Sequence, residues 1–457
     1  MIFMNKEDLQ IVSVSELLRE PLGIPIYQRP YRWNTDSASL LFNDMHESFS
    51  KLGQEYRIGT VVLHRDSEEN KLMIVDGQQR LTTLSILVLC IKELLQDSTT
   101  INFDEYTGLL LSDDTYSNLS LKAARDNYKV LKEKCLEIKD ELIDFFKYIS
   151  DKCTFVKIIT NNEQEAFQFF DSQNSRGKEL APHDLLKSYH LREMANDNSD
   201  IKLKLIGEWE KENQKGLALF FQNHLYPLTN WYKGKSGLYY SSKKIKVFKG
   251  LKQDNKFNYA VYHKAANLYI EQFNKEKMFE LVNNSELNQF QLTQPIVAGR
   301  RFFIYTHYYL QMYKTVCDYI DKEFDNQMVK DRSGGNGYIR NLFINIVMFF
   351  VDKFDYESLT RSVLNKLYKW AYSLRLKMYS VYPETVNNYA RGQNTRINHG
   401  LNMFNRISEM ASPSEIDSVL LESIKENDFI NHEKPAIENN AGYNNANLWK
   451  QLFGSEK

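Results

Sequence analysis

The break at Asp76-Gly77 constrains the fold of this chain more than any other feature of its sequence. Residues 71–75 have the apolar, β-branched composition of a strand, and residues 81–95 place apolar side chains at helical spacing. Residues 57–64 predict a second strand, and the polar stretch 67–70 predicts a turn between the two. We therefore expect a β-hairpin that runs directly into a helix.

The rest of the N-terminal part continues to mix strands and helices. We expect strands at 11–14 and 154–159, an extended segment around Pro25 and Pro30, and helices at about 35–52, 122–149 and 163–171. Ser15 is expected to cap a short helix, and Thr35 or Asp36 the next one. A loop at 172–180 leads to a helix with Pro182 in its first turn.

Beyond residue 200 the strand patterns fade, and helical patterns dominate to about residue 410, with polar interruptions near 233–256 and 331–337. The sequence therefore predicts an α+β fold with two domains, 1–200 and 201–457, the second mainly helical.

Composition narrows the class of protein and the kinds of site. The formal net charge of -1 means that any site for a polyanion must be a local patch. The four cysteines are scattered and form no metal-ligand spacing, which is typical of a reducing compartment. With no signal-peptide pattern and no apolar run long enough to cross a bilayer, the chain is expected to be soluble and cytoplasmic.

The run from Asp76 to Leu84, DGQQRLTTL, carries the sharpest chemical signal. It lies between a strand and a helix, where backbone N–H groups favour anions and a glycine lets the chain approach a ligand. Arg80 can form paired hydrogen bonds to phosphate oxygens, and Asp76 can hold a magnesium-bound water or orient Arg80. The alternative is a polar helix cap with a surface ion pair.

Two further segments combine amides, guanidinium groups and aromatic rings. In 24–33 two arginines alternate with aromatic residues, which suits contact with bases or phosphates but also a rigid packing segment. In 169–187 a loop containing Asn174 and Arg176 precedes a helix on which Asp184 and Lys187 could pair. The alternative for this segment is a helix–loop–helix connector.

Taken together, the order YQR-x-Y-x-W, GTVVL, VDGQQRLTTL and F-x-x-x-N-x-R-G…D-L-L-K resembles the ParB-like DGQQR family. That family includes the N-terminal domain of GmrS in GmrSD-type, modification-dependent (type IV) restriction systems. The resemblance covers about the first 190 residues and implies a ParB/sulfiredoxin-like α+β domain that hydrolyses a nucleoside triphosphate with Mg2+. It assigns catalytic roles to Asp76, Gln78, Gln79 and Arg80, with Asp76 as the metal ligand. It assigns nucleotide binding to Gln28, Arg29, Gly77, Asn174 and Arg176, and the hydroxyls of Thr82 and Thr83 in the first helical turn are expected to add to the same site.

DNA contact is predicted for the lysine-rich segment between Trp231 and Lys256, where aromatic residues alternate with the lysines. Lysines there could neutralise phosphates while the aromatic rings stack or pack, although most such runs are solvated loops. The predicted DNA-binding residues are Lys233, Lys235, Lys243, Lys244, Lys246 and Lys249. Arg300 and Arg301 are further candidates.

Many members of the family also carry an HNH nuclease domain, and the sequence offers no histidine cluster with that spacing. We therefore expect an NTP hydrolase that couples nucleotide use to recognition of foreign or modified DNA in anti-phage defence, with a separate HNH nuclease subunit as partner. A homodimer is a further expectation. Two alternatives remain open: a non-catalytic nucleotide- or DNA-binding switch module that recruits a nuclease, and a ParB-like DNA nickase.

Overall fold

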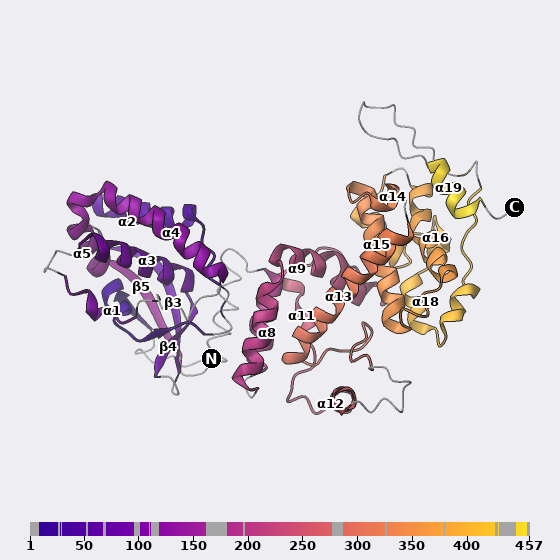
Figure 1. The fold of residues 1–457 in the computed structure, drawn as a ribbon, viewed down its shortest axis with the longest axis horizontal. Coiled ribbons are helices and arrows are strands. Elements are labelled where there is room, and N and C mark those ends of the chain that lie inside the picture. Colours follow the sequence, from indigo (N-terminus) through magenta and orange to yellow (C-terminus); the bar gives the residue numbers. More distant parts are fainter. Residues whose placement is uncertain are drawn as a thin grey trace. The chain divides into compact units, whose positions relative to one another are not determined.

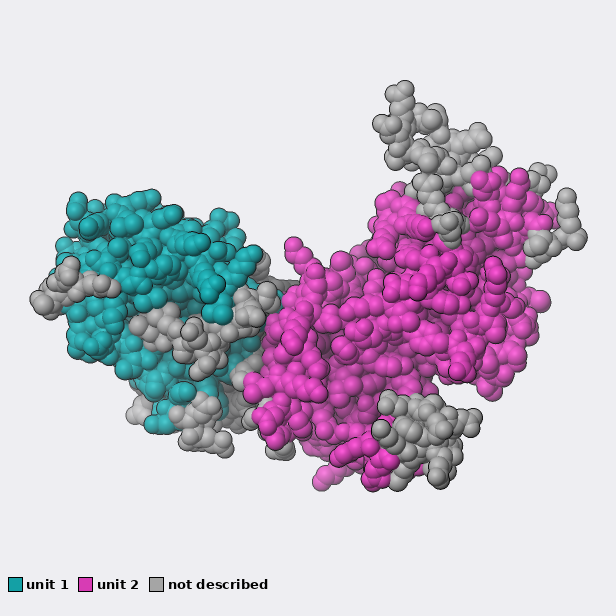
Figure 2. Space-filling model, in the orientation of Figure 1, with its two compact units in different colours: residues 1–180 teal, residues 181–457 magenta. Residues whose placement is uncertain are grey.

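The computed structural model describes residues 9–25, 28, 30–51, 54–66, 70–95, 101–108, 110, 118–160, 181–194, 197–276, 287–324, 327–378, 380–425, 428 and 445–454. The chain divides into two compact units, Met1–Leu180 and Ala181–Lys457 (Figure 1, Figure 2). It passes from one to the other between Leu180 and Ala181, whereas residue 200, the predicted boundary, lies inside helix α8 (Ser199–Lys211).

The N-terminal unit is built on a five-stranded mixed sheet of order β1-β5-β3-β4-β2. Its strands are β1 (Leu9–Ser13), β2 (Leu22–Gly23), β3 (Tyr56–Asp66), β4 (Lys71–Asp76) and β5 (Cys153–Thr160). β3 and β4 pair antiparallel, which confirms the predicted hairpin, and β3 pairs parallel with β5. The register of the β3–β5 pair shifts between Arg57 and Gly59, and this irregularity turns out to lie beside the candidate site.

The helices of this unit pack with the sheet around one apolar core. Within the described residues they are α1 (Val14–Leu18), α2 (Thr35–Ser50), α3 (Gln78–Leu94), α4 (Asn118–Glu137) and α5 (Leu142–Lys152). α3 is buried on almost every side, and its apolar residues join those of the other four helices in a single cluster. The predicted helix over 122–149 is interrupted by a short 3-10 turn, Lys139–Glu141, so α4 and α5 are separate elements.

Two predicted helix caps were placed incorrectly. Ser13, not Ser15, caps α1, and its hydroxyl and the Glu16 carboxylate exchange hydrogen bonds with each other's backbone N–H groups. Asn34, not Thr35 or Asp36, caps α2 by accepting a hydrogen bond from the Ser37 N–H. In both cases the polar side chain just before the expected residue reaches the free N–H groups first, so the helix starts earlier.

The described residues of the C-terminal unit are mostly helical, which confirms the α+β class for the whole chain. Its elements are α7 (Pro182–Arg192), α8, α9 (Gln214–Phe220), α10 (Tyr226–Trp231), α11 (Lys246–Lys249), α12 (Asn258–Glu276), α13 (Arg300–Glu323), α14 (Gln327–Lys330), α15 (Gly334–Lys353), α16 (Arg361–Lys377), α17 (Pro383–Ala390), α18 (Met403–Glu409) and α19 (Asn445–Phe453). A π-helical stretch, Phe221–Leu225, joins α9 to α10. α15 is buried along most of its length and packs against α13, α16, α17 and α18.

Hydrogen bonds of buried polar side chains connect neighbouring segments of this helical unit. Asn398 adopts a left-handed backbone conformation, and its side chain donates to the Tyr389 hydroxyl at 2.7 Å, which in turn donates to the Trp370 carbonyl at 2.7 Å. His190 stacks on Phe302, and its two ring nitrogens bond to backbone groups of Phe248 and Gly299. Complete burial lowers the pKa of His190 to about 3, so this ring is neutral at physiological pH.

All four cysteines are free thiols. Cys90, Cys135 and Cys153 are buried, and burial raises the pKa of each thiol to about 12. Within the described residues, no helix combines the length and the apolar character needed to span a bilayer.

Candidate functional site

The strand-to-helix turn at Asp76-Gly77 forms the centre of the candidate site. β4 ends at Asp76, α3 begins at Gln78, and Gly77 between them has φ +96°, a conformation that glycine adopts without strain. No side chain of the described residues caps the helix, and the first helical backbone bond is donated by Leu81 to the Gly77 carbonyl. The preceding N–H groups therefore form an uncapped, electropositive helix start of the kind that favours anions.

Arg80 lies against the neighbouring strand β3. Its guanidinium donates to the Thr60 carbonyl at 2.9 Å and to the Ile58 carbonyl at 3.4 Å. A Cβ atom on Gly59 would stand 1.9 Å from Arg80 Nη1, so only glycine leaves room for this group. Arg80 Nη2 is also 3.9 Å from an Asp76 carboxylate oxygen, and about a quarter of the arginine side chain remains exposed. Gly59 opens the GTVVL motif, but the sequence pattern assigned it no role, although a glycine within a strand is a signal of close approach.

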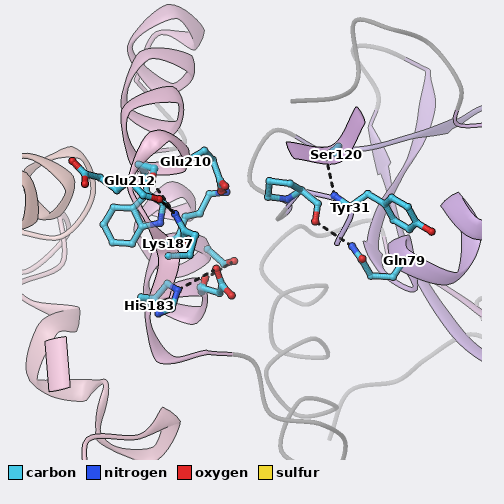
Figure 3. A network of polar contacts seen from close by, with 12 residues as sticks. Tyr31, Gln79, Ser120, His183, Lys187, Glu210 and Glu212 are labelled. Carbon is cyan, nitrogen blue, oxygen red and sulfur yellow. Dashed lines mark hydrogen bonds and ion pairs between the residues drawn. The ribbon is translucent and has the colours of Figure 1, made fainter. Parts of the chain in front are cut away.

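Gln79 uses its amide to hold the segment that precedes α2 (Figure 3). Its carbonyl oxygen accepts hydrogen bonds from the Arg32 N–H at 2.8 Å and the Trp33 N–H at 3.2 Å, and its amide nitrogen donates to the Pro30 carbonyl at 3.4 Å. The segment around Tyr31 thus docks on the start of α3.

Thr83 belongs to the same structural network. Its hydroxyl bonds to the Tyr31 hydroxyl at 2.7 Å and donates to the Gln79 carbonyl at 2.9 Å. The Tyr31 hydroxyl also accepts from the Asn127 amide at 2.7 Å, so the first two motifs are linked through α4. Burial raises the pKa of Tyr31, which keeps its hydroxyl protonated.

Gln78 and Thr82 differ from their neighbours, because each has a buried oxygen without a hydrogen-bond partner among the described residues. The two unpartnered atoms are the side-chain carbonyl oxygen of Gln78 and the hydroxyl oxygen of Thr82. Gln78 is 5% exposed and Thr82 is 0% exposed. They are four residues apart on α3 and so lie on one face of its first turns. Buried polar atoms are satisfied in most proteins, so a ligand or water that supplies hydrogen-bond donors would complete this pair.

The other residues predicted to bind nucleotide are described only in part. Gln28 donates from its amide to the carbonyls of Val75 at 2.6 Å and Ile74 at 3.1 Å, so it lies at the end of β4 beside the turn. Arg29, Asn174 and Arg176 lie outside the described residues.

Asp76 is the predicted magnesium ligand, and its position would let it supply one carboxylate to a bound metal ion. Its side chain is about 30% exposed and is not consumed by a short ion pair within the described parts of the chain. Among the described residues, no three or more His, Cys, Asp or Glu side chains gather as a metal-ligand group. A single carboxylate fits Mg2+ that is carried by a nucleotide and keeps its waters and phosphate ligands, rather than a metal cage made of protein ligands.

The third motif continues into α7, where the expected Asp184–Lys187 pair does not form. Lys187 instead pairs with Glu210 of α8 at 2.5 Å, and both groups are largely buried (Figure 3). Asp184 lies 4.0 Å from the ring nitrogen of His183, which precedes it on α7. The partner from α8 is more than 20 residues away in sequence, so helical spacing could not reveal it.

The lysine-rich segment is tied into the C-terminal unit at several points. Asn387 of α17 accepts from Trp231 Nε1 at 3.0 Å and from the Gly237 N–H at 2.9 Å. Lys244 donates to the Leu238 carbonyl at 2.9 Å, and Lys249 lies over the Tyr189 ring at 4.8 Å from its centroid. The remaining predicted DNA-binding residues have exposed or half-buried side chains: Lys233, Lys235, Lys243 and Lys246.

The aromatic residues of this segment mostly face the core. Trp231 and Phe248 are buried, and burial raises the pKa of Tyr240, whereas Tyr239 is 69% exposed. Most of these rings therefore pack instead of offering stacking surfaces. Arg300 and Arg301 both contact Glu271 of α12, at 3.1 and 2.5 Å, so these two candidate DNA contacts also hold α12 in place.

Comparison with known families also gives two parts, but it divides the chain between residues 191 and 201, so the first match includes most of α7 from the second structural unit. Residues 13–191 match the family model of the GmrSD restriction endonuclease, N-terminal domain, and residues 201–435 match a family of unknown function (DUF7834). No HNH nuclease domain is found, and no curated protein matches the chain. Since the second match covers just over half of the chain, the chain belongs to the family of unknown function DUF7834, and it joins that helical family to a GmrSD restriction endonuclease N-terminal domain.

Proposed function

We propose that this chain is the nucleotide-hydrolysing component of an anti-phage, modification-dependent DNA restriction system, with the triphosphate bound at the start of α3. The domain match makes a restriction system the natural setting. The observation that carries the nucleotide site is the pair Gln78 and Thr82, unpartnered within the described structure, beside an uncapped helix start. An anion-favouring helix end and two unsatisfied buried oxygens together fit a ligand with both phosphate and hydrogen-bond donors.

Each residue has a distinct part in this proposal. The free N–H groups at the start of α3 bind phosphate oxygens, and the exposed part of Arg80 adds positive charge beside them. Gln78 and Thr82 accept from ligand hydroxyl or amino groups, or from a water. Asp76 is the residue that would hold Mg2+, which supplies charge neutralisation when bound.

The test compares the two adjacent glutamines. Phosphate release is measured with ATP, GTP, CTP and UTP plus magnesium, with and without modified DNA, for the parent chain, Gln78→Leu and Gln79→Leu. Gln78→Leu removes a carbonyl oxygen that has no partner in the described structure, so we expect thermal stability at least equal to that of the parent and about a tenfold or greater loss of nucleotide affinity or turnover. Gln79→Leu breaks three backbone contacts and should lower stability as well.

The proposal fails if Gln78→Leu binds and hydrolyses every nucleotide as the parent does. Arg80→Ala is a poorer probe, because Arg80 also supports β3, so a loss of activity there could reflect altered structure. Arg80→Lys, which keeps the charge without the paired geometry, is the companion variant.

A second candidate function is a nucleotide-responsive switch without turnover. It is favoured by the engagement of Gln79 and Arg80 with backbone carbonyls and N–H groups, which leaves fewer groups to position an attacking water. In that case nucleotide binds and Gln78→Leu weakens binding, but no phosphate is released under any condition. Recruitment of a separate nuclease would then be the output of the nucleotide-bound chain.

A further inference from the structure

One helix of the C-terminal unit presents an apolar face to solvent. α12, which Figure 1 shows nearly end-on at the edge of this unit, follows the lysine-rich segment. Its inner side is well fixed: Ala260 and Phe273 are buried, Lys264 donates to the carbonyls of Gln253 and Asn255, and Glu271 pairs with Arg301 at 2.5 Å. These contacts hold one side of α12 at a few points, while most of its other side chains are exposed or half-buried.

The outer side of α12 carries an apolar stripe at helical spacing. The exposed fractions are 51% for Val261, 74% for Tyr262, 59% for Leu268 and 57% for Tyr269, and Ala265 between them is also exposed. These positions follow the i, i+1, i+4, i+7, i+8 pattern that normally faces a core. A contiguous exposed apolar stripe of this kind is typical of a surface that contacts another molecule.

The stripe is nearly symmetric about Ala265. Reversing the helix about that residue places Val261 opposite Tyr269 and Tyr262 opposite Leu268, while Asn258 and Gln272 meet at the two ends. Each pairing is apolar against apolar or amide against amide. Ala265 meets its own copy, and its small side chain lets two helices approach closely.

We propose that the stripe Val261, Tyr262, Ala265, Leu268 and Tyr269 is the contact through which two copies of this chain pair, with their α12 helices antiparallel about a two-fold axis at Ala265. A two-fold contact requires a self-complementary patch, and the near-symmetry of the stripe meets that requirement. None of its residues carries a charge, which favours a protein partner over nucleic acid, whose backbone requires cations.

The size of the stripe sets the strength of the contact. Five side chains of this kind bury about 500 Å² per copy, less than the roughly 800 Å² per partner of a stable complex. The dimer should therefore dissociate on dilution, and its population should rise with protein concentration.

The first experiment measures the oligomeric state of the full chain by sedimentation over a range of concentrations. Leu268→Glu introduces a charge into the stripe and should shift the dissociation constant at least tenfold toward monomer. Leu203→Glu is the matched control, because Leu203 is a 53% exposed leucine on another helix, α8. A parent chain that stays monomeric at every concentration, or a dimer unaffected by Leu268→Glu, overturns the proposal.

The second experiment tests the antiparallel geometry by thiol cross-linking. Ala265→Cys should cross-link to its own copy, and Val261→Cys alone should not, whereas Val261→Cys combined with Tyr269→Cys should. Parallel pairing would make Val261→Cys cross-link by itself and would overturn the proposed arrangement. Loss of DNA binding in Tyr262→Ala, with no change in oligomeric state, would assign the stripe to nucleic acid instead.

Discussion

Two adjacent glutamines of one motif have different surroundings, although the sequence presents them as equivalent. Gln79 gives its amide to three backbone groups of the segment before α2, whereas the carbonyl oxygen of Gln78 has no partner in the described part of the chain. The direction of each side chain depends on the helix starting at Gln78, three residues before the start that apolar periodicity predicts. The structure therefore separates a positioning residue from a candidate ligand-binding residue.

The unpartnered hydroxyl of Thr82 leads to a stability prediction. Thr82→Val keeps the shape of the side chain and removes a buried polar group that has no hydrogen bond to the described residues, so we expect the free energy of unfolding to rise by about 1 kcal/mol. Denaturant unfolding without nucleotide measures this effect. Nucleotide should then stabilise the variant less than the parent. A variant less stable than the parent would indicate that the hydroxyl has a partner after all.

The buried carboxyl group of Asp352 leads to a prediction of how the free energy of unfolding depends on pH. Its carboxylate is buried and accepts from the Tyr309 hydroxyl at 2.5 Å and the Leu292 N–H at 2.7 Å, yet burial raises its pKa from 3.8 to about 7. Between pH 4 and pH 7 the unfolded chain loses this proton while the folded chain keeps it, so stability falls as the pH rises through that window, by up to about 4 kcal/mol.

The measurement is the free energy of unfolding against pH for the parent chain and Asp352→Asn. The difference between the two should vary across pH 4–7 and level off above it, because other groups titrate equally in both chains. A constant difference across that window would show that Asp352 is ionised in the folded chain.

At the scale of elements, the Arg80 guanidinium of helix α3 donates to two backbone carbonyls of strand β3, and Gly59 leaves the room for it. The Gly59 backbone has φ +144°, and the Arg80 guanidinium occupies the space that a side chain would need. Gly59→Ala should therefore lower the free energy of unfolding by about 2–3 kcal/mol and weaken nucleotide binding, with Arg80 itself unchanged.

Gly207→Ala is the control for this substitution. Gly207 lies within α8, and a Cβ atom at this position would meet no neighbouring group of the described structure within 4 Å, so alanine there should stabilise the helix by about 0.5–1 kcal/mol. Chemical denaturation of both variants checks the pair of expectations. Equal effects at the two glycines would mean that the Arg80 contact contributes little.

Much of the element order follows from local sequence patterns. The features that local patterns do not predict are those that rest on long-range contacts. The β3–β4 hairpin, the strand–turn–helix at Gly77, the first-turn Pro182 and the helical second half all follow from periodicity and turn residues. The pairing of β3 with β5, which lies almost 100 residues away, has no local signal. The same limit applies to the Lys187–Glu210 pair and to the packing of Trp231 and Phe248 inward.

At the scale of the whole molecule, the chain is two units with separate cores. The apolar cluster of the N-terminal unit draws its residues from 12–155. We therefore expect residues 1–180, expressed alone, to unfold cooperatively and to keep nucleotide binding. Calorimetry and nucleotide titration of that fragment test this, and a fragment that is unfolded in isolation would contradict it.

The thiols of this chain make it well suited to optical measurement. Cys90, Cys135 and Cys153 are buried and held protonated at ordinary pH, so maleimide dyes should react with them slowly. With Cys317, which is half-buried, replaced by serine, a pair of introduced surface cysteines could carry donor and acceptor fluorophores. Energy transfer between one dye on each unit would then report, molecule by molecule, whether the distance between the two dyes changes when nucleotide is added.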